Sequence, residues 1–218
     1  AELEQLLTIG TRVPDHGKLV PFRLLAIRGD ARARLGLPAE YLLFVGTFEP
    51  RKNLPGLLNA YAQLRTRLPD APPLVIAGRR GWLYESIFAL VESLGLSAYV
   101  LWRENIAASD LPALYNGALL LALPSFYEGF GLTALEAMAC GVPVVAADRA
   151  SLPEVVGSAG ILIDPDRVES LADGLYSALT DSALREHCRR EGLARAATFT
   201  WQRTAEIALS VYQRVLAN

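Results

Sequence analysis

The sequence has few of the residues that build metal centres or disulfide frameworks. It contains only two cysteines and two histidines in 218 residues. Cys140 and Cys188 are far apart and belong to no CxxC pair, which argues against structural zinc and against a disulfide-stapled fold. Unpaired cysteines are typical of a reducing compartment, so we expect a cytoplasmic location.

An excess of one charge and long hydrophobic runs are also lacking. The formal net charge is -2, which provides no overall positive field to attract nucleic acid. Although 52% of the residues are hydrophobic, no run approaches the ~20 residues that a membrane span needs. The first five residues lack the basic start of a signal peptide. We therefore expect a soluble protein that neither binds nucleic acid nor spans a membrane.

Short apolar segments alternate with amphipathic segments along most of the chain. The short segments are apolar at nearly every position, which is typical of strands buried on both faces of a parallel sheet. They cover residues 41–45, 74–77, 99–102, 118–123, 142–147 and 161–163. Apolar residues recur with helical periodicity in the segments between them, and the predicted helices cover residues 53–68, 82–94, 109–115, 132–139, 168–179, 182–197 and 201–216.

This alternation predicts an α/β fold with a doubly wound parallel sheet, in other words a Rossmann-like domain. The predicted domain covers residues 41–218, and residues 1–40 are interpreted as a linker or the remnant of another domain. Ser109 and Asp110 are placed to cap one helix and Gly95 to end another. Trp82 is expected to pack against its own helix.

Two strand-to-helix loops carry the candidate functional residues, because ligands of open α/β sheets bind beyond the carboxyl ends of the strands. The first loop places Arg51 and Lys52 just before a predicted helix. Two cations beside a helix N-terminus suit a diphosphate, and a solvated surface pair is the alternative.

The second loop runs from Glu128 to Glu136. Gly129 and Gly131 would let the backbone approach a ligand closely. Since a helix rises ~1.5 Å per residue, Glu128 and Glu136 should act on different parts of a ligand and not as a close acid/base pair. A carboxylate can accept two hydrogen bonds from the vicinal diol of a ribose or hexose; a surface helix position is the alternative for Glu136.

The segment from Glu128 to Val145 resembles the E-x7-E signature of the family 4 glycosyltransferases. Other segments similar to that family occur in the expected order, at residues 45–53, 110–115 and 152–157. The resemblance covers about residues 35–217. It implies one half of a GT-B fold, namely the C-terminal donor-binding domain of a retaining, metal-independent hexosyltransferase.

The resemblance also implies roles for individual residues. Lys52 and Arg51 would hold the donor diphosphate, Glu128 would lie near the transferred sugar, and Glu136 would bind the ribose. The donor-binding set contains Gly46, Thr47, Arg51, Lys52, Ile106, Glu128, Gly129, Phe130, Gly131, Leu132 and Glu136, and the catalytic set contains Glu128, Lys52 and Arg51. Two positions depart from the family pattern, because Thr47 stands where relatives often have Arg and Glu104 where they often have Gly.

The implied substrate is a nucleotide sugar, with no cofactor. GDP-mannose is favoured and UDP-sugars are the alternative. The implied partner is an N-terminal acceptor-binding domain. Residues 182–197 contain several arginines that a peripheral contact with anionic lipid would use, although a solvated helix face is the simpler interpretation. The alternative interpretation is a non-catalytic nucleotide-sugar-binding module. A dehydrogenase-type domain is disfavoured because no GxGxxG follows the first strand.

Overall fold

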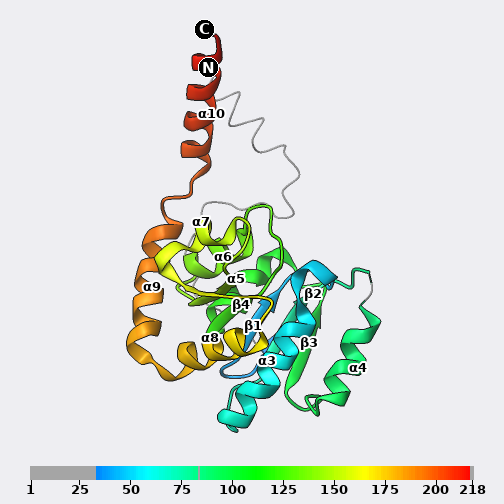
Figure 1. The fold of residues 1–218 in the computed structure, drawn as a ribbon. Helices are drawn as coiled ribbons and strands as arrows, with labels where there is room; N and C mark the ends of the chain where they lie inside the picture. The colour runs from blue at the N-terminus through cyan, green and yellow to red at the C-terminus, as the bar shows by residue number, and fades with distance from the viewer. Residues whose placement is uncertain (1–32, 83, 217–218) are drawn as a thin grey trace.

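The computed structural model describes residues 33–82 and 84–216, which form an α/β unit around a six-stranded sheet (Figure 1). All neighbouring strands are parallel, in the order β3-β2-β1-β4-β5-β6. The strands are β1 (Leu42–Val45), β2 (Leu74–Gly78), β3 (Val100–Glu104), β4 (Leu120–Leu123), β5 (Val144–Ala147) and β6 (Ile161–Ile163). The predicted doubly wound α/β fold is confirmed, and the strand ends agree with prediction to within two residues.

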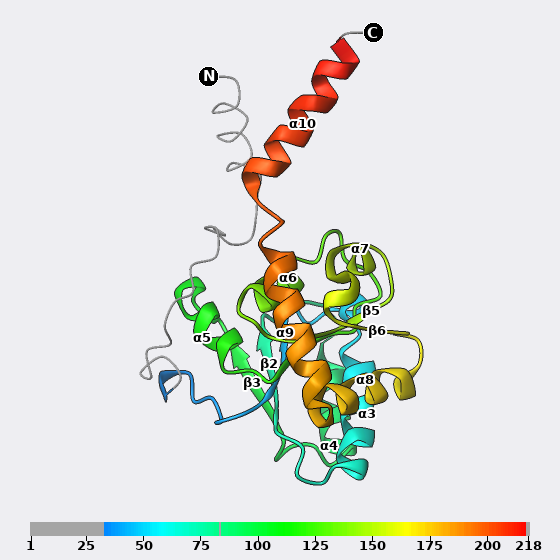
Figure 2. The same cartoon turned by 90° about the vertical axis from the view of Figure 1, so that its left-hand side faces the viewer.

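Helices cover the sheet, which explains why the strands are apolar on both faces. The longer helices are α3 (Leu54–Arg67), α4 (Glu85–Ser93), α6 (Leu132–Ala139), α8 (Val168–Thr180), α9 (Ser182–Ala196) and α10 (Trp201–Leu216). Helices α3 and α8 pack on one another, and α9 packs on α6 and α8 (Figures 1 and 2). Two short helices, α5 (Leu111–Asn116) and α7 (Leu152–Val156), pack on α6.

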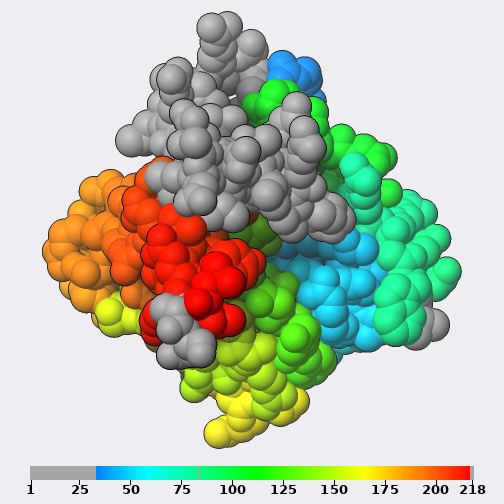
Figure 3. All heavy atoms as spheres, turned by 90° about the horizontal axis from the view of Figure 1, so that it is seen from above, coloured from blue at the N-terminus to red at the C-terminus, as the bar shows by residue number. Residues whose placement is uncertain are grey.

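Helix α10 extends away from the sheet and its helices (Figures 1 and 2). Viewed from above, α10 and α9 occupy one side of the surface, and α3 and α4 occupy the other (Figure 3). The apolar residues Ile207, Val211 and Val215 of α10 are 56%, 40% and 69% exposed. Among the described residues, no helix combines the length and apolar character needed to cross a membrane.

The strand order reverses between β1 and β4. The sheet winds outward from β1 through β2 to β3, and then continues on the other side of β1 through β4 to β6. At such a switch point the loops after the two central strands diverge to opposite faces and leave a crevice at the carboxyl edge. The two loops predicted to carry function are those that follow β1 and β4.

Several local predictions were wrong. Trp82 does not pack in a helix, since it is 61% exposed and precedes α4, which begins at Glu85. Asp110 makes no side-chain cap for α5 and instead pairs with Arg34 at 2.5 Å. Helix α7 was not predicted, because five residues are too few to display a helical period.

Residues 1–32, within the predicted linker, lie outside the described residues. The described part of that segment contacts the domain. Leu37 belongs to the hydrophobic core, and Arg103 Nε in β3 donates to the Leu35 carbonyl at 2.6 Å. The packed unit therefore includes residues before Tyr41.

Candidate functional site

The loop after β1 ends in one 3-10 turn, η1 (Pro50–Lys52), which carries both cations. Proline at its first position favours the turn, because its φ is already fixed. Asn53 then adopts a left-handed conformation with φ 53°, and its side-chain oxygen accepts from Gly56 N at 3.2 Å to cap α3. Its amide nitrogen donates to the Pro165 carbonyl at 2.9 Å. Asn53 thus ends the turn that carries Lys52 and caps the start of α3.

The loop after β4 is joined to this turn by one backbone hydrogen bond and one hydrogen bond from the Arg51 side chain. Phe126 N donates to the Arg51 carbonyl at 2.8 Å, and Arg51 Nη1 donates to the Tyr127 carbonyl at 3.0 Å. Ser151 Oγ donates to the Glu128 carbonyl at 2.9 Å from the start of α7. The two predicted loops therefore form one connected structure at the switch point.

Lys52, Arg51 and Glu128 meet in one charged cluster. Lys52 Nζ lies 2.5 Å from Glu128 Oε1, and Arg51 Nη1 lies 3.2 Å from Glu128 Oε2. The side chains of Lys52 and Glu128 are only 7% and 11% exposed, so this pair interacts in a medium that screens charge less than water does. Arg51 is 44% exposed and also pairs with Glu49 at 2.6 Å. The cluster therefore contains one buried and one accessible cation.

Ser125 is a member of this cluster that sequence reasoning missed. It directly follows Pro124 at the end of β4, is fully buried, and donates from Oγ to Glu128 Oε1 at 2.7 Å. A hydroxyl three residues before the candidate acid was the only available signal in the sequence. Ser125 and Lys52 both contact Oε1, so the orientation of the Glu128 carboxylate is set by two partners.

Glycines shape the same edge of the sheet. Gly131 is the N-cap of α6 and has a φ of 104°, a conformation that residues other than glycine rarely adopt. A Cβ on Gly78, at the end of β2, would lie 1.8 Å from the Gly46 carbonyl oxygen. Gly78 is therefore required for the close approach of the loop that leads to Arg51 and Lys52. A Cβ on Gly129 would meet no atom within 4 Å, so packing does not explain a glycine there.

Glu136 lies one turn inside α6 and does not join the cation cluster. Its Oε2 accepts a hydrogen bond of 2.5 Å from the hydroxyl of Tyr115 in α5. Burial and the Glu136 carboxylate raise the pKa of Tyr115 well above 10. Burial, followed by the same carboxylate, raises the pKa of the Cys140 thiol from 9.0 to about 11. Tyr115 of α5 thus contacts Glu136, whereas Lys52 of the loop after β1 contacts Glu128. That the two glutamates act on different parts of a ligand stays a prediction.

The other predicted site residues line the edges of these loops. Thr47 is exposed, and Ile106 is half-buried against the core after Asn105, whose φ is 57°. Phe130 and Leu132 are 46% and 36% exposed. No interaction brings these four side chains into the charged cluster among the described residues. The roles implied for Ile106, Phe130 and Leu132 depend on their backbone groups.

The base-side position Glu104 has a partner that was not anticipated. Arg80 Nε donates to Glu104 Oε1 at 2.9 Å and to Oε2 at 3.2 Å. The Arg80 guanidinium also lies 5.3 Å from the centre of the Phe88 ring. The Arg80–Glu104 ion pair therefore joins the end of β3 to the loop after β2, two residues before Ile106.

Two of the arginines near α9 do not belong to a solvated face. Arg185 Nη1 donates to the carbonyls of Ala178 and Leu179, and Arg195 Nε donates to the Val155 carbonyl at 2.6 Å. Carbonyls at the ends of α8 and α7 have no hydrogen-bond donor within their own helix, and these two arginine side chains provide the donors. Only Arg189 and Arg190 fit the predicted solvated face, with side chains 54% and 65% exposed.

One acidic pair was overlooked in the prediction of a metal-free site. Asp164 and Asp166 have a D-x-D spacing, and carboxylates are suitable ligands for divalent cations. Asp166 pairs with Arg149 at 2.6 Å, and Asp164 Oδ1 accepts from Asp166 N at 3.0 Å. No group of three His, Cys, Asp or Glu side chains with metal-binding geometry occurs among the described residues.

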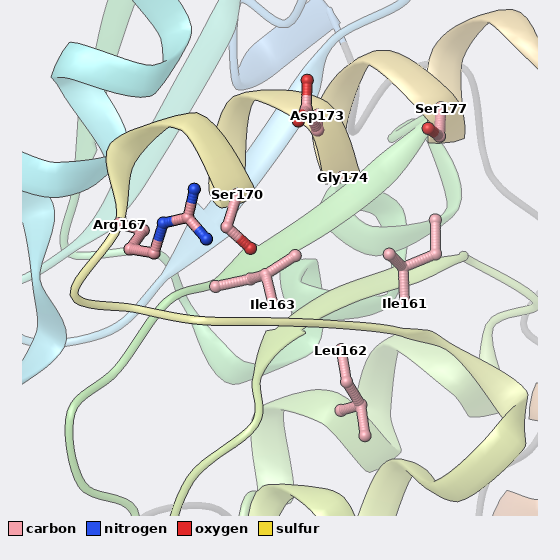
Figure 4. A pocket seen from close by; sticks show the side chains of 8 residues that line it. All are labelled: Ile161, Leu162, Ile163, Arg167, Ser170, Asp173, Gly174 and Ser177. Carbon is pink, nitrogen blue, oxygen red and sulfur yellow. The ribbon is translucent and has the colours of Figure 1, made fainter.

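A separate cavity of about 330 Å³ lies between β6 and α8 (Figure 4). Its wall is formed by apolar residues of the edge strand on one side and by polar residues of α8 on the other. Asp173 on this wall pairs with Arg67 at 2.5 Å. None of the predicted site residues lines this cavity, which is distinct from the switch-point site.

Comparison with known proteins identifies this Rossmann-like unit as a glycosyltransferase domain. The chain belongs to the family described as glycosyl transferases group 1, whose model matches residues 29–195. Over 173 residues it is 42% identical to O-antigen chain mannosyltransferase B of Escherichia coli, covering 79% of this chain and 45% of that protein. It is 34% identical over 217 residues to the serotype-specific mannosyltransferase WbdA of Escherichia coli, covering 99% of this chain and 26% of that protein.

Solved structures agree with this family. Sucrose-phosphate synthase from Thermosynechococcus elongatus matches with a TM-score of 0.76 and 32% identity, over 89% of this chain and 50% of that one. Anabaena Alr3699/HepE in complex with UDP and glucose matches with a TM-score of 0.74 and 26% identity, over 84% and 51%. The chain thus spans at most about half the length of these similar proteins.

Proposed function

We propose that this chain is the donor-binding domain of a retaining, metal-independent hexosyltransferase that uses a nucleotide diphosphate sugar. The observation that carries the proposal is the convergence of Arg51, Lys52 and Glu128 from two loops at the switch point, with Lys52 Nζ 2.5 Å from Glu128 Oε1. The acceptor would be held by a second, N-terminal domain. The mannosyltransferase names of the two similar Escherichia coli proteins support mannose as the sugar.

The proposed chemistry follows from charge. Breaking the bond between sugar and phosphate builds positive charge on the sugar and negative charge on the diphosphate. Lys52 and Arg51 would stabilise the leaving diphosphate, because fixed cations in a poorly screened site need no reorganisation during the reaction. Backbone N–H groups at the start of α6 would add partial positive charge. Glu128 would face the sugar, where a carboxylate stabilises a developing cation.

Donor identity is tested by calorimetric titration of the chain with GDP-mannose, UDP-glucose and UDP-N-acetylglucosamine. We expect GDP-mannose to bind, and Glu136→Ala to abolish that binding by removing the partner of the ribose hydroxyls. Glu92→Ala is the matched control, since Glu92 is an exposed glutamate on α4. If none of the three donors binds, or if Glu136→Ala binds as tightly as the unaltered chain, the proposed site is wrong.

Mechanism is tested in a protein that also contains the acceptor-binding domain. We expect transfer with retention of anomeric configuration, read by NMR of the product, and activity that persists in EDTA. Binding of a donor without transfer in that two-domain protein would instead identify a non-catalytic nucleotide-sugar-binding module. A cytoplasmic location stays a prediction, supported by two cysteines that form no disulfide.

A further inference from the structure

Tyr115 is a buried residue beside the carboxylate that the proposed function assigns to the ribose. The residue is 2% exposed, and its hydroxyl donates to Glu136 Oε2 at 2.5 Å. Tyr115 belongs to α5 and Glu136 to α6, and these two helices pack on one another. One charge-assisted hydrogen bond therefore joins the side chains of two neighbouring helices at the edge of the site.

We propose that Tyr115 is a positioning residue that holds the Glu136 carboxylate ready to accept hydrogen bonds from the ribose 2′- and 3′-hydroxyls. This inference rests on the proposed function. A glutamate side chain has several rotatable bonds, and freezing them when the ligand arrives would weaken binding. A carboxylate that is anchored beforehand loses less freedom, which is the general advantage of preorganisation.

The chemistry of the two groups permits this role. A carboxylate offers about four lone-pair sites, so a hydrogen bond from Tyr115 can coexist with hydrogen bonds from a vicinal diol. Burial and the adjacent carboxylate raise the pKa of Tyr115 well above 10. The hydroxyl therefore remains a donor at neutral pH and always presents a proton to Glu136.

Tyr115 also connects the ribose carboxylate to the loop expected to meet the base. Helix α5 follows Ile106 after only the short turn η2 (Ala108–Asp110), so residues from Ile106 to Tyr115 form one compact segment. The hydrogen bond to Glu136 ties the far end of this segment to α6. The base-side loop and the ribose carboxylate are thereby linked through this hydrogen bond.

The test compares ribonucleotides with their 2′-deoxy counterparts. GDP and 2′-deoxy-GDP, with UDP and 2′-deoxy-UDP in parallel, are titrated into the unaltered chain and into Tyr115→Phe, which keeps the buried ring. We expect the unaltered chain to prefer the ribonucleotide about tenfold, the scale of one hydrogen bond to a charged group. In Tyr115→Phe that preference should fall to about twofold or less, and the deoxynucleotide, which keeps only the 3′-hydroxyl, should lose less affinity than the ribonucleotide.

Tyr61→Phe is the matched control. The Tyr61 hydroxyl is also buried, but it donates at 2.8 Å to the Pro72 carbonyl before β2. We expect this variant to keep the full preference for the ribonucleotide. Thermal melting of each variant shows that it is folded. In a Glu136→Ala background, Tyr115→Phe should cause no further loss of preference, since the two residues act through one bond.

The outcomes separate the two proposals. If the unaltered chain binds none of these nucleotides, the proposed function fails and this inference fails with it. If the unaltered chain binds and folded Tyr115→Phe keeps the preference for the ribonucleotide, only the role of Tyr115 is overturned. Equal weakening of ribo- and deoxynucleotides also overturns it, because that result indicates a general effect on the fold.

Discussion

Lys52→Met and Glu128→Gln remove the charge from opposite ends of one buried ion pair, whose side chains are 7% and 11% exposed. Removing one partner of a fully buried pair costs about 3–5 kcal/mol. Arg51 and Ser125 still contact Glu128 at 3.2 Å and 2.7 Å after Lys52 is changed, so we expect a smaller loss of about 2 kcal/mol. In a chain of this size that loss lowers the melting temperature by about 4–8 °C.

The two variants should have opposite effects on diphosphate binding. In the unliganded protein, Glu128 neutralises the cations that the proposed function assigns to the diphosphate. Glu128→Gln removes this competitor, so we expect GDP to bind about 3–10-fold more tightly. Lys52→Met removes a charge-assisted hydrogen bond, so GDP should bind about tenfold more weakly. GDP is the suitable ligand because it lacks the sugar that Glu128 is proposed to face.

Calorimetric titration gives the affinities, and urea unfolding followed by circular dichroism gives the stabilities. The double variant Lys52→Met/Glu128→Gln should be more stable than the sum of the single losses predicts, because it leaves no unpaired charge. Arg149→Met is the control, since its pair with Asp166 is 42% and 58% exposed and should contribute under about 1 kcal/mol. Strictly additive stability losses, or weaker GDP binding in both single variants, would refute the reasoning.

Four further predictions concern three glycines and the pH dependence of stability. Gly129→Ala should keep the melting temperature, because a Cβ there meets nothing within 4 Å. It should weaken nucleotide-sugar binding about tenfold if the backbone approaches the ligand. Gly131→Ala, at φ 104°, should lower the free energy of unfolding in urea titrations by about 1–2 kcal/mol. Gly78→Ala should lose about 1–3 kcal/mol in the same assay, because its Cβ would lie 1.8 Å from the Gly46 carbonyl oxygen. Burial raises the pKa of Cys140 from 9.0 to about 11. The free energy of unfolding should therefore be highest below pH 9 and decline from pH 9 to 11, because the thiol ionises first in the unfolded chain. Urea unfolding across that range should show a shallower decline in Cys140→Ala.

The sequence predicted the layout of the domain well because the relevant signals are local. Strands buried on both faces are apolar throughout, and helices repeat their apolar residues with helical periodicity, so both can be recognised in short windows. Two of the failures occurred where a partner lies elsewhere in the chain. Asp110 was predicted to cap a helix, but Arg34 takes its carboxylate at 2.5 Å. Arg195 was placed on a solvated face, but it donates to carbonyls about 40 residues away, at Glu154 and Val155.

By itself, the sequence determined the α/β class and the two loops that carry charged and glycine residues. These properties depend on composition and spacing along the chain. Only the tertiary structure decided which charges meet, since the Lys52–Glu128 pair and the Tyr115–Glu136 hydrogen bond join residues 76 and 21 positions apart. Contacts of that kind depend on the order of strands in the sheet, where β4 lies next to β1. No periodicity in the sequence encodes that neighbour relation, because it results from packing the whole chain around one core.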